Sequence, residues 1–183
     1  MELALFPLSV FLLPGGRTRL RIFEPRYLRL VSEAMSSQQG FGLCLPTDED
    51  GIYELGTQVE IYDFDQGDDG YLTIDIVGKD RFIIENVSQD ADGLMHGEVA
   101  LVDSWDIREV PDQYHFIADS LEKALDAHPL YDNSKSDRQL QDLSWVCQRW
   151  LEILPIAKDK KYYLAQQNDL NAVVDFVCQV IKQ

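Results

Sequence analysis

The sequence predicts a mixed α+β fold in which a body of short strands with one inserted helix is followed by an α-helical bundle. Up to about residue 105, apolar and polar residues alternate, which is typical of half-buried strands. After Pro111, apolar residues recur every three or four positions, which is typical of amphipathic helices. The period changes between Asp103 and Pro111. We therefore expect one domain over residues 1–108 and a second over residues 109–183.

Turn signals divide the first half into short strands and one helix. Pro25 suits the first turn of that helix, because its missing N–H would have no partner there. The helix is expected to end between Ser36 and Gly40. Short strands with regular turns between them favour a compact barrel or sandwich. The expected strands cover residues 3–8, 10–13, 17–23, 41–46, 56–65, 71–77, 81–87 and 94–102.

The second half carries apolar stripes at helical spacing. One stripe runs from Tyr114 to Leu125. Residues 136–139 have the pattern of a capping box, and we expect them to begin a helix that ends at Pro155. Two further helices are expected over residues 158–166 and 169–181. Together these segments predict the helical bundle.

The charge balance argues against nucleic acid and anionic membranes as partners. The chain has 16 Lys and Arg against 32 Asp and Glu, a net charge of −16. Such a surface repels phosphate groups, whose attraction supplies most non-specific affinity for nucleic acids. No stretch approaches the ~18 consecutive apolar residues of a membrane span. The amino terminus lacks the basic start and long apolar run of a secretory signal, so we expect a cytoplasmic protein.

Motifs for catalysis, metal binding and cofactor binding do not stand out. Gly78-Lys79 is not part of a phosphate-binding loop, and the acidic run 63–70 lacks the glycine and glutamate that an EF-hand loop needs. The histidines have no metal-ligand spacing. The cysteines, Cys44, Cys147 and Cys178, are widely spaced and odd in number, which fits thiols in a reducing compartment. We therefore predict no catalytic residue, no bound metal and no cofactor.

The most informative charge pattern is a short basic strip on an acidic chain. Residues 17–29 hold five arginines against one glutamate, whereas residues 61–110 hold three basic and thirteen acidic residues. Arginine binds carboxylates through a bidentate fork, so the strip could recognise acidic groups on a partner. The simpler interpretation is that these arginines pair internally with the acidic strands. We favour the internal pairs and keep the recognition surface as the alternative.

Several short motifs follow one another along nearly the whole chain. They are Leu5-Phe6-Pro7-Leu8, Leu12-Leu13-Pro14-Gly15, Leu20-Arg21-Ile22-Phe23-Glu24-Pro25-Arg26-Tyr27, Leu55-Gly56-Thr57, Gly78-Lys79-Asp80-Arg81-Phe82, Leu154-Pro155 and Lys161-Tyr162-Tyr163-Leu164. Their order resembles the amino-terminal domain of Lon proteases, and the long motif around Pro25 is similar to the stand-alone bacterial version of that domain. The resemblance implies a PUA-like β pseudo-barrel followed by a helical bundle.

The same resemblance implies a protein that recognises polypeptides rather than one that cuts them. A full Lon protease continues into an ATPase module and a Ser-Lys protease module, and this chain of 183 residues has no phosphate-binding loop. We therefore expect neither ATP hydrolysis nor proteolysis from this chain alone. None of the family's catalytic residues has a counterpart position here, so the resemblance assigns no catalytic residue.

Three functional hypotheses follow from these observations. The first is a non-catalytic module that binds unfolded or tagged polypeptides, or a partner protein, with extended peptide adding to an open strand edge. Its candidate peptide-binding residues are Phe11, Leu12, Pro14, Phe23, Arg26 and Tyr27. For Arg26 and Tyr27 we favour a structural role, with Tyr27 packed into the barrel and Arg26 tied to a neighbouring acid.

The alternatives come from two other classes of protein. One is an enzyme of unrecognised class that uses a cleft between the barrel and the bundle, since clefts between domains are common ligand sites. The other is a self-assembling homo-oligomer, in which the acidic and basic stretches pair between copies.

Overall fold

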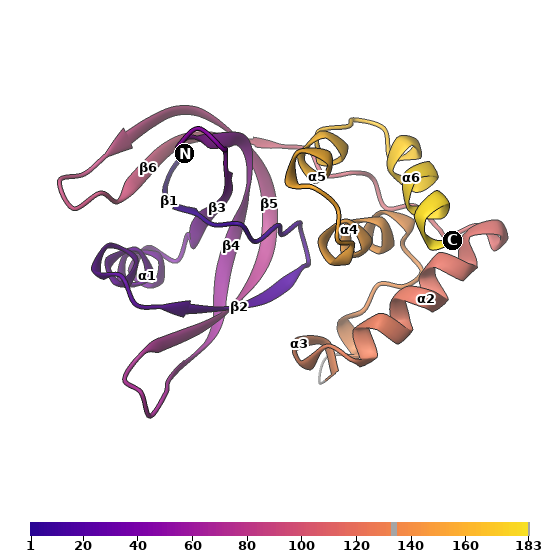
Figure 1. Ribbon diagram of the computed structural model, residues 1–183, viewed down its shortest axis with the longest axis horizontal. Coiled ribbons are helices and arrows are strands. Elements are labelled where there is room, and N and C mark those ends of the chain that lie inside the picture. The colour runs from indigo at the N-terminus through magenta and orange to yellow at the C-terminus, as the bar shows by residue number, and fades with distance from the viewer. Residues whose placement is uncertain (133–134, 183) are drawn as a thin grey trace. The chain divides into compact units, whose positions relative to one another are not determined.

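The computed structural model describes residues 1–132 and 135–182, which form two compact units, Met1–Asp103 and Ser104–Gln183 (Figure 1). The first unit holds the strands and one helix, and the second is helical. The expected α+β class is thereby confirmed. That residues 1–108 and residues 109–183 are separate domains stays a prediction.

The first unit contains a six-stranded sheet and one helix, as far as it is described. Its elements in chain order are β1 (Glu2–Pro7), β2 (Arg17–Ile22), α1 (Pro25–Ser37), β3 (Phe41–Pro46), β4 (Ile52–Gln66), β5 (Leu72–Gln89) and β6 (Met95–Val102). The order across the sheet is β2-β5-β4-β3-β1-β6, and β5 also pairs with β6. The pairings from β1 through β3, β4, β5 and β6 therefore return to β1. Strand β2 lies outside this ring of pairings and is joined to it through β5.

Strand β5 is longer than the sequence pattern predicts. Two strands were expected over residues 71–77 and 81–87, whereas one strand of 18 residues spans both. The Gly78 segment is not a turn, because its backbone N–H and C=O bond to the loop before β2: Gly15 N–H donates to the Gly78 carbonyl at 2.8 Å, and Gly78 N–H donates to the Gly16 carbonyl at 2.9 Å. A Cβ at Gly78 would overlap the carbonyl of Leu13, so glycine permits this close approach.

The predicted strand over residues 10–13 does not form. Leu12 and Leu13 are buried, but their segment is irregular and carries no ladder. The Thr57 hydroxyl donates to the Leu12 carbonyl at 2.7 Å, which satisfies a buried acceptor that a neighbouring strand would otherwise have to satisfy. Apolar residues here indicate burial, and they were wrongly assigned to a strand.

Helix α1 packs on the sheet and closes the larger core of the first unit (Figure 1). Pro25 occupies the first turn as predicted, and the helix ends near Gln38, whose φ is 58°. The residues on its buried side are Tyr27, Leu30, Val31 and Ala34. These residues share one core cluster with apolar residues of the strands, including Phe6, Ile22, Phe41, Val59 and Ile74. The helix and β2 are therefore held against the same core.

The second unit contains the helices α2 (His115–Asp126), α3 (Pro129–Asp132), α4 (Leu143–Ile153), α5 (Lys158–Ala165) and α6 (Asn171–Ile181). The expected capping box at residues 136–139 does not begin α4. The N-cap is Asp142, whose carboxylate accepts from Ser144 N–H at 3.0 Å. The segment before it is tied elsewhere, because Arg138 donates to Asp126 at 2.8 Å and to the Tyr131 carbonyl at 3.0 Å.

Candidate functional site

A groove runs along strand β2 in the first unit and has a volume of about 380 Å³. One side comes from the end of β1 and the residue after it, and the other from β2 and the first turn of α1. Its lining residues are Phe6, Pro7, Leu8, Arg19, Leu20, Arg21, Ile22, Phe23, Glu24, Arg26 and Tyr27. The groove is thus built from apolar side chains with three arginines and one glutamate among them.

The groove follows the free edge of the sheet. Over the described strands, β2 pairs antiparallel with β5 and with no other neighbour. Its side chains alternate as the sequence predicts: Leu20 and Ile22 are buried, whereas Arg19 and Arg21 are exposed. An edge strand presents unpaired backbone N–H and C=O groups along one side. The side of β2 away from β5 therefore offers hydrogen-bonding groups to an extended chain.

The structure brings together three of the six predicted peptide-binding residues. Phe23, Arg26 and Tyr27 line the groove, whereas Phe11, Leu12 and Pro14 lie outside its described lining. Phe23 is 63% exposed. Leu12 is buried in the core cluster, and Phe11 and Pro14 are half-buried. The peptide-binding role of each residue stays a prediction.

Tyr27 forms part of the groove floor and part of the core. Its ring stacks on Phe6 and is only 8% exposed. Burial raises the pKa of its phenol, so the group stays protonated at neutral pH. The Arg26 guanidinium lies over the Tyr27 ring, 4.7 Å from its centroid. Arg26 also donates to Glu24 at 2.9 Å and to the Gly93 carbonyl at 3.3 Å.

The basic strip forms internal ion pairs. Arg19 makes a bidentate contact with Asp75 on β5 at 2.6 and 2.7 Å, and Arg21 makes a single bond to Asp69 at 2.7 Å. Arg29 bonds Asp90 and Asp92 in the turn between β5 and β6. These pairs connect β2 and α1 to acidic residues distant in sequence. The internal network favoured by the sequence is therefore present, and the exposure of Arg19 and Arg21 leaves them accessible as well.

The groove has the chemistry of a binding surface. Its described lining contains no serine, cysteine or histidine that could act as a nucleophile or base. Cys44 lies in the core, where burial raises the pKa of its thiol to about 12. In the part of the chain that is described, no group of three or more acidic, histidine or cysteine side chains is placed to hold a metal ion. What the groove offers is apolar contact, backbone hydrogen bonding and guanidinium groups.

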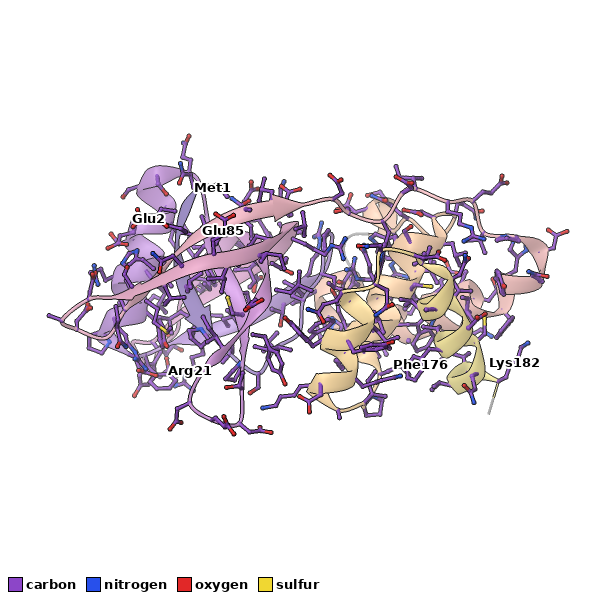
Figure 2. All side chains as sticks on the ribbon, turned by 90° about the horizontal axis from the view of Figure 1, so that it is seen from above. Met1, Glu2, Arg21, Glu85, Phe176 and Lys182 are labelled. Atoms are coloured by element: carbon purple, nitrogen blue, oxygen red, sulfur yellow. The ribbon has the colours of Figure 1, made fainter. Side chains whose placement is uncertain are left out.

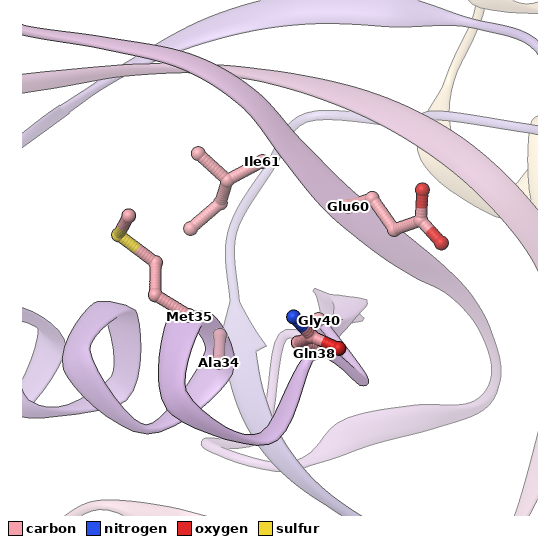
Figure 3. Close-up of a pocket in the computed structure, with 6 residues that line it drawn as sticks. All are labelled: Ala34, Met35, Gln38, Gly40, Glu60 and Ile61. Carbon is pink, nitrogen blue, oxygen red and sulfur yellow. The ribbon is translucent and has the colours of Figure 1, made fainter.

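A second hollow lies between the end of α1 and strand β4 (Figure 3). Its volume is about 340 Å³, and Met35 and Ile61 extend toward each other across it. Glu60 at its border pairs with Lys79 at 3.2 Å. The hollow lacks a free strand edge, so the β2 groove is the better candidate for holding a polypeptide.

Sequence reasoning does not single out Pro7 and Leu8, which are expected only as part of a short strand. Phe6 belongs to the large apolar residues considered for a binding patch, and Arg19 and Arg21 belong to the basic strip considered for recognition of acidic groups. A signal was available in the alternation of residues 17–22, because an outward face made only of arginines is typical of a protected edge strand. What no local pattern shows is that the end of β1 lies across from that edge.

Comparisons with known proteins agree over the length of the chain. The family model for the ATP-dependent protease La (LON) substrate-binding domain matches residues 2–182. A solved Lon N-terminal domain protein from Xanthomonas campestris is 32% identical, with a TM-score of 0.80 over 98% of both chains. The N-terminal domain of a Mycobacterium avium complex Lon protease shares the fold, with a TM-score of 0.70 over 100% of this chain and 99% of that one, at 14% identity.

A curated relative is more distant and much longer. Protein cereblon of Danio rerio is 27% identical over 101 residues, which are 51% of this chain and 23% of that protein. The chain thus spans about a quarter of that relative. Where helices are described, none is both long and apolar enough to cross a membrane.

Proposed function

Since the chain belongs to the family of Lon substrate-binding domains, we propose that it recognises polypeptides and leaves their covalent bonds intact. The bound segment lies extended in the groove along β2 and adds to the sheet as a further strand. Its partners are unfolded or tagged polypeptides, or a segment of a partner protein, in the cytoplasm. Nucleic acids are not among them, because a chain with net charge −16 repels phosphate.

The observation that carries the proposal is the free edge of β2 beside an exposed aromatic residue. Backbone groups on this edge would supply sequence-independent hydrogen bonds, which suits a protein that binds many different polypeptides. Phe23 is 63% exposed beside Leu8 and Tyr27, so a bound apolar side chain could cover it. Covering a phenylalanine contributes roughly 1.5–3 kcal/mol. Apolar contact and edge pairing together provide affinity without any reactive group.

The proposal separates recognition from catalysis. The matched family is described as a substrate-binding domain, which is a non-catalytic role. We propose that residues 1–183 have no ATPase or protease activity by themselves. The homo-oligomer formed by pairing of acidic and basic stretches stays a prediction: Arg19, Arg21 and Arg29 pair within the chain, while Arg19 and Arg21 also remain exposed.

A titration with an unfolded polypeptide tests this function. Fluorescently labelled casein, an unstructured probe, is titrated with the full chain and followed by anisotropy. In Phe23→Ala the affinity is expected to fall about tenfold, since a large apolar contact is lost. The matched control is Leu101→Ala on β6, because Leu101 is 54% exposed and lies outside the groove.

Both variants are expected to melt with the parent, since exposed side chains contribute little to stability. Absence of casein binding to the parent chain contradicts the proposed function. Equal losses of affinity in Phe23→Ala and Leu101→Ala contradict the assignment of casein binding to the groove.

A further inference from the structure

We propose that the β2 groove selects extended segments in which apolar residues alternate with acidic ones. This inference rests on the proposed function and adds the class of polypeptide that the groove prefers. It depends on three features of the described residues: the pleat of β2, the unused donors of its arginines, and the repulsion that the same arginines exert on basic strands.

The pleat of β2 determines which side chains of a bound strand face which surface. In paired strands, residues that lie opposite each other point to the same side of the sheet. A strand added on the free edge of β2 would therefore place alternate side chains beside Leu20 and Ile22, toward the apolar floor that includes Phe6 and Tyr27. The side chains between them would lie beside Arg19 and Arg21, on the outer face.

The two outer arginines retain donors for a partner carboxylate. A guanidinium has five N–H donors. Arg19 uses its Nε and Nη2 on Asp75, and Arg21 gives a single bond from Nη2 to Asp69. Their side chains are 60% and 56% exposed, and Figure 2 shows Arg21 at the outside of the first unit. A carboxylate on an added strand can thus bond to these groups while Asp75 and Asp69 keep their contacts.

Asp75 and Tyr71 hold the two arginines in place. Asp75 is largely buried, so its bidentate contact orients Arg19 from the side of β5. The Arg21 guanidinium lies 4.3 Å from the centroid of Tyr71, and this contact restricts its rotamers. Arginines that are already ordered lose less side-chain entropy when they bind a further carboxylate.

The same arginines reject basic segments and a second copy of β2. Like charges directly opposite each other in paired strands are destabilising. If two copies of β2 paired edge to edge, arginines would face arginines, so this edge is protected against self-association. A lysine-bearing segment meets the same repulsion. The pairing preference therefore favours acidic residues, although the chain as a whole is acidic.

Four short peptides of equal length test the preference by titration at one ionic strength. The first alternates valine or phenylalanine with glutamate, the second replaces glutamate by glutamine, and the third replaces it by lysine. The fourth has the composition of the first in a shuffled order without alternation. The first is expected to bind about three- to tenfold more tightly than the glutamine peptide, and more tightly still than the lysine peptide. The shuffled peptide is expected to bind more weakly than the first.

Arginine variants then locate the effect. The double variant Arg19→Gln, Arg21→Gln is expected to bind the glutamate and glutamine peptides equally. Arg17→Gln is the matched control, because Arg17 lies on the same face of β2 outside the groove lining, and it is expected to keep the preference. Circular dichroism and melting confirm that each variant is folded.

The outcomes separate the inference from the proposed function. If all four peptides bind the parent chain equally, the acidic preference is wrong while polypeptide binding stands. If a preference for glutamate persists in the double variant, its assignment to Arg19 and Arg21 is wrong. If neither casein nor any of the four peptides binds, the proposed function itself fails.

Discussion

Phe6 on β1 and Tyr27 on α1 stack with ring centroids 4.0 Å apart and an angle of 23° between their planes. Both rings also line the groove beside β2. The same pair thus fastens α1 to the strand body and forms the floor on which a bound side chain would lie. Substitutions here act on folding and on binding together, and variants must be chosen to separate the two.

Truncation of Tyr27 is expected to destabilise the first unit strongly. Tyr27→Ala removes a buried ring and leaves a cavity against Phe6, at a cost of about 3–5 kcal/mol in the free energy of unfolding. Tyr27→Phe keeps the stack and is expected to cost less than about 1.5 kcal/mol. Urea denaturation followed by circular dichroism measures both. Similar midpoints for Tyr27→Ala and the parent chain would contradict the core role of this ring.

Removal of the Arg26 side chain is expected to affect stability more than binding. Arg26 bonds Glu24 and the Gly93 carbonyl and lies over Tyr27, so it connects the start of α1 to the turn between β5 and β6. Arg26→Ala is expected to lower the free energy of unfolding by about 0.5–1 kcal/mol, with casein affinity changed less than twofold. Arg26→Lys keeps the charge without the planar fork and serves as the comparison. An unchanged melting temperature combined with lost casein binding would reverse this assignment.

The contact of Arg29 with the turn between β5 and β6 is expected to depend on pH. Hydrogen bonds from Arg29 lower the pKa of Asp90 and of Asp92 below the usual 3.8. These pKa values are lower in the folded chain than in the unfolded chain. The contact therefore contributes its full stabilisation at pH values above the pKa of the two carboxyls in the unfolded chain. That stabilisation is lost as pH falls through the lowered folded values. The difference in melting temperature between the parent and Arg29→Gln is therefore expected to be constant near neutrality and to shrink below about pH 3.8.

Two neighbouring groups define the control for this pH experiment. Asp90 also faces His96 Nε2 at 3.2 Å, and Arg29 bonds Glu33 at 2.9 Å. Both groups are unchanged in Arg29→Gln. In a background of Asp90→Asn and Asp92→Asn, the effect of Arg29→Gln is expected to be small at every pH, since only the contact with Glu33 remains. A difference in melting temperature that persists at low pH in the parent background would assign the stabilisation to something other than these carboxylates.

Several elements could be predicted from local sequence because their cause is local. Pro25 begins α1 through its fixed φ and missing donor, and the alternation in 17–22 marks β2. The bounds of β3, Phe41–Pro46, agree with the prediction. The start of α4 was wrong, because the capping pattern at Ser136 competes with Asp142, and the contacts of Arg138 with distant residues favour the later start.

Other features depend on contacts between segments far apart in the chain. The sequence predicts separate strands on either side of Gly78, yet the loop at Gly15 and Gly16 bonds to its backbone and β5 is continuous. The irregular segment at Leu12 has the composition of a strand, but the bond from Thr57 replaces a ladder. Backbone groups are satisfied by whichever partner the tertiary structure brings within reach, and local propensity does not identify that partner.

The sequence by itself determined which side chains of β2 face the core and which face outward, because side chains of a strand alternate with period two whatever its neighbours are. It also determined that the outward face is basic. Only the tertiary structure decided that β2 pairs with β5 and that Phe6 and Leu8 lie across from its free edge, because strand order follows from pairing between distant segments. Because β2 pairs with β5 along one side only, Arg19 and Arg21 lie at the border of the groove.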